Sequence, residues 1–138
     1  MIIAQELAKA LLNKANEVAI ANSYTLIPQG QQYSPGIDET YVMESCLFGD
    51  NTTIGYANNS KDIQFGVYQI AIYTPKTQEG YRWLGLSIAD KFSEAFAMGA
   101  QLSSGGQMVE ILKASVTNPT LSSTHMTHIL SVRFNVIN

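Results

Sequence analysis

The sequence contains few charged residues. Asp, Glu, Lys and Arg make up 14% of the 138 residues, against about 25% in an average soluble domain. Neutral polar residues take their place, since 40 of the 138 residues are Asn, Gln, Ser or Thr. A surface of amides and hydroxyls can pack against other proteins at a lower desolvation cost than a charged one. The composition therefore fits an assembly subunit, and equally a soluble protein with a Ser/Thr-rich surface.

The sequence also lacks cysteine pairs, long apolar runs and an excess of basic residues. The single cysteine, Cys46, excludes an intramolecular disulfide and a cysteine-rich zinc site. It lies in an apolar strand pattern, so we expect a buried thiol. No apolar run approaches the roughly 18 residues of a membrane span. With eight bases against eleven acids and a net charge of −3, the chain has no basic footprint of a nucleic-acid binder.

Hydrophobic periodicity predicts two helices and four strands. The helices are expected at residues 2–20 and 81–98, where apolar residues recur at steps of three and four. The strands are expected at residues 40–48, 62–73, 107–116 and 125–137, with turns or connectors at 22–39, 49–61, 74–80, 103–106 and 117–124. This order, α-β-β-α-β-β, predicts one α+β domain over residues 1–138. We expect a single mostly antiparallel or mixed sheet of about four strands, with two helices on one face.

Two of these segments allow sharper predictions. The second half of the strand at 62–73 is apolar on both faces, which indicates a central position in the sheet. Leu84, Ile88 and Phe92 form a narrow stripe on the second helix and are expected in the core.

Sequences that might support catalysis or metal binding lack the required context. Gly85-Leu86-Ser87-Ile88-Ala89 resembles a hydrolase nucleophile elbow, but it lies inside a predicted helix and not at a strand-to-helix turn. His125 and His128 are three residues apart in a predicted strand, so their side chains should point to opposite faces. We therefore predict no enzymatic activity, no catalytic residues, no bound metal and no cofactor.

Four acidic residues could meet near one end of a hairpin and bind a hard cation through carboxylate oxygens. They are Asp38, Glu39, Glu44 and Asp50. Solvated acids in loops are the simpler interpretation, and we favour it.

The middle of the chain resembles the tail-terminator-like proteins of long-tailed bacteriophages. The resemblance lies in Phe65-Gly66-Val67-Tyr68-Gln69-Ile70-Ala71-Ile72-Tyr73-Thr74-Pro75, followed by Gly80 and a helix with Ile88-Ala89-Asp90-Lys91-Phe92 and Phe96. The N-terminal helix, the extended segment Tyr41–Phe48 and the closing hairpin fit the same pattern loosely. Residues 22–39 and 49–61 match no pattern of that family.

The resemblance implies a structural virion protein. Such subunits form homo-hexameric rings that cap the head-proximal end of the tail tube, stop its polymerisation and provide the surface that docks the head. The partners implied are further copies of the chain, the tail tube protein and a head-completion or neck protein. The implied location is the virion tail, reached through the host cytoplasm during assembly. No cofactor or membrane is implied.

Other functions remain open. The nearest is another ring protein of the neck or tail, such as a head-completion or tube subunit. A small non-enzymatic ligand-binding α+β domain is a different class, and an enzyme ranks last because no acid, base and nucleophile can be named. Size in solution separates these, because a ring should be several-fold larger than 15.1 kDa.

The resemblance also implies that DNA passes through the central hole of the ring. With a net charge of −3 per subunit, we expect a neutral or acidic pore that does not bind DNA specifically. Basic side chains on the pore wall would instead hold the phosphates in a salt-dependent manner.

The polar segment 49–61 is the candidate assembly site. It is long for a hairpin loop, where two to five residues are common. Asp50, Asn51, Asn58 and Lys61 lie in it outside any apolar pattern, so we predict that they act in assembly and not in folding. A mobile surface loop is the alternative.

Overall fold

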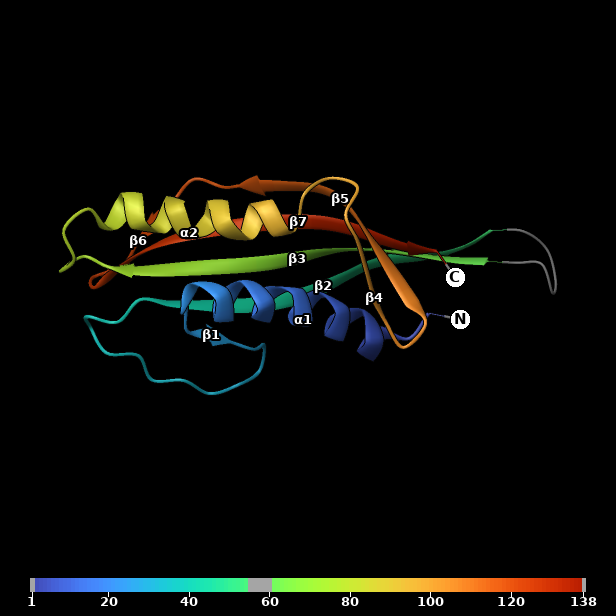
Figure 1. The fold of residues 1–138 in the computed structure, drawn as a ribbon, viewed down its shortest axis with the longest axis horizontal. Coiled ribbons are helices and arrows are strands. Elements are labelled where there is room, and N and C mark those ends of the chain that lie inside the picture. Colours follow the sequence, from blue (N-terminus) through green and yellow to red (C-terminus); the bar gives the residue numbers. More distant parts are fainter. Residues whose placement is uncertain (1, 55–60, 138) are drawn as a thin grey trace.

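A computed structural model describes residues 2–54 and 61–137, with side chains for residues 2–49 and 63–137. Figure 1 shows the helices lying along a long, twisted sheet. The elements in chain order are α1 (Ala4–Asn22), β1 (Leu26–Ile27), β2 (Tyr41–Ile54), β3 (Lys61–Pro75), α2 (Tyr81–Ala95), β4 (Gln101–Ser104), β5 (Gln107–Val116), β6 (Thr120–Leu121) and β7 (His125–Ile137). The fold is α+β, as predicted.

The sheet has the strand order β1-β2-β3-β7-β5-β4. β6 pairs with the first residues of β7, which β5 does not reach. β1 runs parallel to β2, whereas the other described pairs are antiparallel, so the sheet is mixed. β3 lies between β2 and β7, which confirms its predicted central position.

Both helices pack on the same face of the sheet. Alternate side chains of β3 and β7 are fully buried beneath them, namely Tyr68, Ile70, Ile72, Leu130, Val132 and Phe134. α1 contributes Leu7, Leu11 and Ala15 to this core, and α2 contributes Ile88, Phe92 and Phe96. Leu84 is partly buried and packs against the same cluster, so the predicted stripe on α2 belongs to the core.

The prediction of about four strands in the order α-β-β-α-β-β is wrong, because the sheet has seven. The three additional strands, β1, β4 and β6, are two to four residues long. That length is too short for alternation to stand out from the flanking polar residues. The segment 103–106 was expected to be a flexible connector. Ser103 and Ser104 instead end β4, and Gly105 and Gly106, with positive φ angles of 54° and 80°, form the hairpin turn to β5.

The prediction of a loop at 49–61 is also wrong at both ends. β2 continues to Ile54 and β3 begins at Lys61, and the two strands pair from Asn51–Gln64 to Ile54–Lys61. A β-bulge between Phe48 and Asn51 absorbs the change of register. Polar residues hid these strand ends, since they give no apolar alternation. We call residues 47–54 with 61–67 the arm; it extends past the ends of both helices at the right of Figure 1.

Gly85 allows α2 to pack closely on β7. A Cβ atom at this position would lie 2.4 Å from Nδ1 and 2.7 Å from Cε1 of His128, whose side chain is fully buried. Glycine to alanine inside a helix ordinarily stabilises by roughly 0.5–1 kcal/mol. We expect Gly85→Ala to destabilise instead, because α2 or the ring must shift. Denaturant unfolding would measure it.

The matched control is a double-mutant cycle with His128→Ala. Removing the ring also removes the clash, so Gly85→Ala should cost less in the His128→Ala background than in the wild type. An equal cost in both backgrounds would contradict the close contact as the cause.

Candidate assembly surface

The face of the sheet opposite the helices exposes apolar side chains at the arm end. Leu47, Phe65, Met108 and Ile137 are 47%, 42%, 51% and 51% exposed, and we call them the outer patch. They come from β2, β3, β5 and β7, neighbouring strands whose register brings these positions to the same end of the sheet. A shallow hollow of about 120 Å³ lies between Met108 and Ile137. Grouped exposed apolar side chains of this kind mark interaction surfaces.

The same outer face has few charges. Among its described side chains on β2, β3, β5 and β7, the charged ones are Glu110, Lys113 and Arg133. Burying this face against another protein would therefore desolvate few charged groups, each of which costs several kcal/mol if left unpaired. The outer face is suited to protein contact more than to a charged ligand.

An aromatic cluster covers the other end of the outer face. Tyr41 stacks on Tyr73 with ring centroids 4.5 Å apart, and its edge contacts the ring of His125. His125 Nε2 lies 2.8 Å from the carbonyl oxygen of Glu39, which fixes the segment before β2 to the sheet. The aromatic cluster thus covers its own end of the outer face, whereas the outer patch at the arm end stays exposed.

The two histidines lie on opposite faces of β7, as predicted. His125 is in the aromatic cluster on the outer face, whereas His128 is buried beneath α2. They therefore cannot share a metal ion. Among the described residues, no group of three His, Cys, Asp or Glu side chains could hold one.

His128 should make the stability of the fold depend on pH. Its ring nitrogens have no hydrogen-bond partner among the described residues, and burial, with a smaller effect of Arg82, lowers its pKa below the ordinary 6.5. The unfolded chain therefore binds a proton more readily than the folded one, so stability should fall as pH drops below about 6.5.

The test is the free energy of unfolding at pH 7 and pH 5 for the wild type and His128→Leu. We expect the variant, which keeps the core apolar, to show a smaller loss at pH 5. The same loss in both proteins would assign the pH dependence to other groups.

Of the four acidic residues, the three with described side chains form no group that could hold a metal ion. The three with described side chains accept hydrogen bonds from separate donors: Asp38 from Thr77, Glu39 from Gly36 and Tyr33, and Glu44 from the Gln29 amide. The side chain of Asp50 lies outside the described residues. Each described acid has a local structural role.

Glu44, Gln29 and Cys46 form a polar link at the edge of β2. The backbone N–H of Gln29 donates to Glu44 Oε1 at 2.7 Å, and the backbone N–H of Cys46 donates to Gln29 Oε1 at 2.8 Å. Burial, followed by the nearby Glu44 carboxylate, raises the pKa of the Cys46 thiol to about 12. The thiol is therefore protonated at neutral pH and a poor nucleophile. It is buried, as the sequence predicted.

The hydrolase-like sequence lies within α2. Gly85, Ile88 and Ala89 are buried against the sheet, and Ser87 is exposed in the middle of the helix. No strand-to-helix turn presents the serine, so the geometry of a nucleophile elbow is missing.

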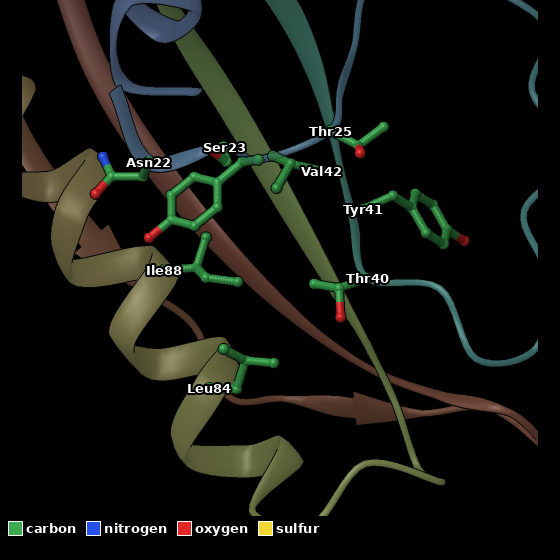
Figure 2. A pocket seen from close by; sticks show the side chains of 9 residues that line it. Asn22, Ser23, Thr25, Thr40, Tyr41, Val42, Leu84 and Ile88 are labelled. Carbon is green, nitrogen blue, oxygen red and sulfur yellow. The ribbon is translucent and has the colours of Figure 1, made fainter. Parts of the chain in front are cut away.

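Figure 2 shows an open pocket of about 260 Å³ at the end of α1. Leu84 and Ile88 of α2 line one side, and Thr40 and Val42 line the other. The lining side chains are aliphatic, aromatic, amide or hydroxyl groups, and none is acidic or basic. The pocket therefore presents no His, Cys, Asp, Glu, Lys or Arg side chain.

The predicted assembly residues lie on the arm or outside the described residues. Asn51 pairs with Gln64, and Lys61 pairs with Ile54 at the start of β3; Asp50 lies in the bulge of β2. The side chains of these three, and all of Asn58, are outside the described part of the chain.

Sequence reasoning missed the apolar part of this surface. Leu47 and Phe48 are adjacent and apolar, and they are 47% and 46% exposed on opposite faces of β2. Two consecutive apolar residues in a strand necessarily point to both faces. The adjacent apolar residues at the end of the predicted strand could therefore have indicated that this part of β2 exposes apolar surface.

A family model matches most of this chain, and two solved structures share its fold. A family model described as phage tail terminator protein matches residues 6–134. No curated protein matches the sequence. One solved structure without a functional description is 19% identical with a TM-score of 0.75, and the match covers 98% of this chain and 96% of that one. A chain of the virion of a native gene transfer agent particle is 17% identical with a TM-score of 0.60, over 99% and 98%. At these identities the two structures show a shared fold.

No helix of the described residues is long and apolar enough to cross a membrane.

Proposed function

This chain belongs to the phage tail terminator family, and from that membership we propose that it forms a homo-hexameric ring that caps the tail tube. The ring stops tube polymerisation and provides the docking surface for a head-completion or neck protein. The observation that carries this proposal is the family match over residues 6–134. A structural role in the phage tail follows from the family itself; the ring and the cap are the proposal.

The surface of the subunit supports such an assembly. A closed ring is built from head-to-tail contacts, in which two different surfaces of each subunit meet. The outer patch, with its exposed apolar side chains and few charges, suits one of these contacts or the contact with the tube. We propose that the arm, with Asp50, Asn51 and Lys61, acts in the same contacts together with Asn58, which lies between the two arm segments in the sequence.

The remaining parts of the proposal concern chemistry and location. We take residues 1–138 as one tail-terminator domain without enzymatic activity or cofactor. DNA passes through the pore of the ring without specific binding, which the net charge of −3 per subunit favours. The subunit assembles in the host cytoplasm and ends in the virion tail.

Particle mass and shape test the ring. Native mass measurement and negative-stain images, with and without tail tubes, should reveal particles of six 15.1 kDa subunits with a central hole. Monomers or two-fold dimers alone, even in the presence of tubes, would contradict the proposal.

A further inference from the structure

Among the described residues, the sheet has two free edges, one on each side. On one side, β1 covers β2 only at Val42 and Met43. On the other, β4 covers β5 only from Gln107 to Glu110, and the segment before β4 extends that cover to Ile111. In Figure 1 the two edge strands β2 and β5 lie on opposite sides of β3 and β7.

The free edge of β2 begins at Phe48. The amide of Val42 donates to Thr25 O at 2.8 Å and that of Cys46 to Gln29 Oε1 at 2.8 Å, both away from β3. Because backbone groups alternate along an antiparallel strand, Phe48 also directs its N–H and C=O away from β3. The partners of Phe48 and Asn51 on β3 are Gly66 and Gln64, which are two residues apart. Asn51 therefore directs its N–H and C=O away from β3, as Phe48 does.

The free edge of β5 comprises its last residues. Ile111 exchanges backbone hydrogen bonds with Gly99 and Ala100 on the side of β4. Past the bulge that follows Ile111, the Thr117 amide donates to Ile129 O at 2.9 Å, toward β7. By alternation, Ala114 and Val116 therefore direct their N–H and C=O outward, where the described residues supply no neighbouring strand.

We propose that the free edge of β2 in one copy pairs with the free edge of β5 in the next copy, which joins the sheets around the ring. This inference rests on the proposed ring and names the strands that form its contact. β2, β3, β7 and β5 alternate in direction, so β5 of one copy beside β2 of the next continues an antiparallel sheet. Across the sheet, Ala114 and Val116 are level with Cys46 and Glu44, whereas the free edge of β2 begins at Phe48. Joined strands would therefore be staggered, as they are in closed barrels.

Side chains at the two edges favour a protein strand as the occupant. Natural edge strands are usually protected by charges or proline, yet Leu47 and Phe48 expose apolar surface on both faces of β2. Val116, at the end of the free β5 edge, is 39% exposed. Pairing would cover these side chains together with the unpaired backbone groups.

Charge identifies a second copy as the better partner. Between Leu47 and Ile54 the only charged residue is Asp50, and between Leu112 and Val116 it is Lys113. The two edges thus have opposite charges and would attract each other between copies. The competing possibility is that this edge of β2 contacts the tail tube protein.

Crosslinking tests the contact. One sample is an assembled mixture of the single variants Phe48→Cys and Val116→Cys, and a second is the assembled double variant. Each is treated with a bismaleimide long enough to tolerate a shift of register. The buried Cys46 is present in every sample, so single variants alone are the controls. We expect dimers from the mixture and a ladder up to the ring from the double variant, with neither in the controls.

Each other outcome has a distinct meaning. Rings without a ladder would overturn the strand pairing and leave the proposed function intact. Absence of rings, even on tubes, would overturn the proposed function as well. If Phe48→Cys formed crosslinks with the tube protein and none with Val116→Cys, the edge of β2 would be assigned to the tube and the inference would be overturned.

Proline at the free edge gives an independent measurement. Val116→Pro removes an outward amide, a position at which edge strands tolerate proline, so the monomer should fold. The subunit concentration needed for half-assembly should rise roughly tenfold or more, the effect of a lost hydrogen bond and a steric block at each contact. Val116→Ala, which keeps the amide, is the matched control. Equal assembly of the Pro and Ala variants would contradict pairing at β5.

Discussion

Replacing Phe92 with alanine should lower the free energy of unfolding by about 3–5 kcal/mol, the usual cost of removing a buried phenylalanine side chain. Phe92 is fully buried between α2 and the sheet, with its ring 5.9 Å from that of Tyr24. A domain's total stability is roughly 5–15 kcal/mol, so the loss would be a large share. Denaturant unfolding followed by circular dichroism measures it.

Trp83→Ala is the matched control on the same helix. Trp83 is 66% exposed, and substitutions at exposed sites usually change stability by no more than about 0.5 kcal/mol. If Phe92→Ala left stability unchanged but abolished assembly, the buried stripe of α2 would be an interface and the packing described above would be wrong.

If the proposed function is right, shortening the arm should weaken tube capping by roughly tenfold or more without unfolding the protein, because the proposed interface contacts are lost while the core stays intact. The change replaces residues 53–62 with Asn-Gly, a two-residue turn that closes the hairpin on the Thr52–Ile63 pair, whose backbone groups face each other. The core residues of β3 begin at Tyr68, outside the deleted segment. We expect the melting temperature to stay within a few degrees of the wild type.

Capping would be measured as the subunit concentration that halves the mean tube length. Met98→Ser, which changes an exposed apolar residue after α2 that is not part of the arm, is the control and should cap normally. Normal capping by the shortened protein would remove the arm from the assembly surface, and its unfolding would show that the arm is needed for folding.

The long elements of this fold could be predicted from the sequence because their periodicity reflects local burial. β7 has the predicted bounds, 125–137, and its alternation from Leu130 to Val136 matches the buried face. The opposite orientation of His125 and His128 followed from the same two-residue period.

The short strands could not be predicted, since they depend on contacts distant in sequence. β1 exists because Leu26 and Ile27 lie beside Val42 and Met43, and two residues give no pattern of their own. The distal arm was missed for a different reason. Its polar residues are in strands because β2 and β3 continue to pair past the last buried side chain.

Sequence reasoning proposed only polar residues for the candidate site, and their role in assembly stays a prediction. Asp50, Asn51 and Lys61 lie on the arm that the sequence indicated. The outer patch depends instead on which side of the sheet the helices cover. Phe65 alternates with buried residues in the same way as a core residue would, and only the packing of both helices on the other face leaves it exposed.

The length of tail tubes grown with this protein tests the capping function itself. Tube protein would be polymerised alone and with increasing amounts of the chain, and tube lengths would be measured in electron micrographs. We expect tubes to become shorter as the protein is added, with a ring at one end only and no growth at that end after fresh tube protein is supplied. Tubes that keep their length and grow at both ends at every concentration of the protein would contradict the proposed function.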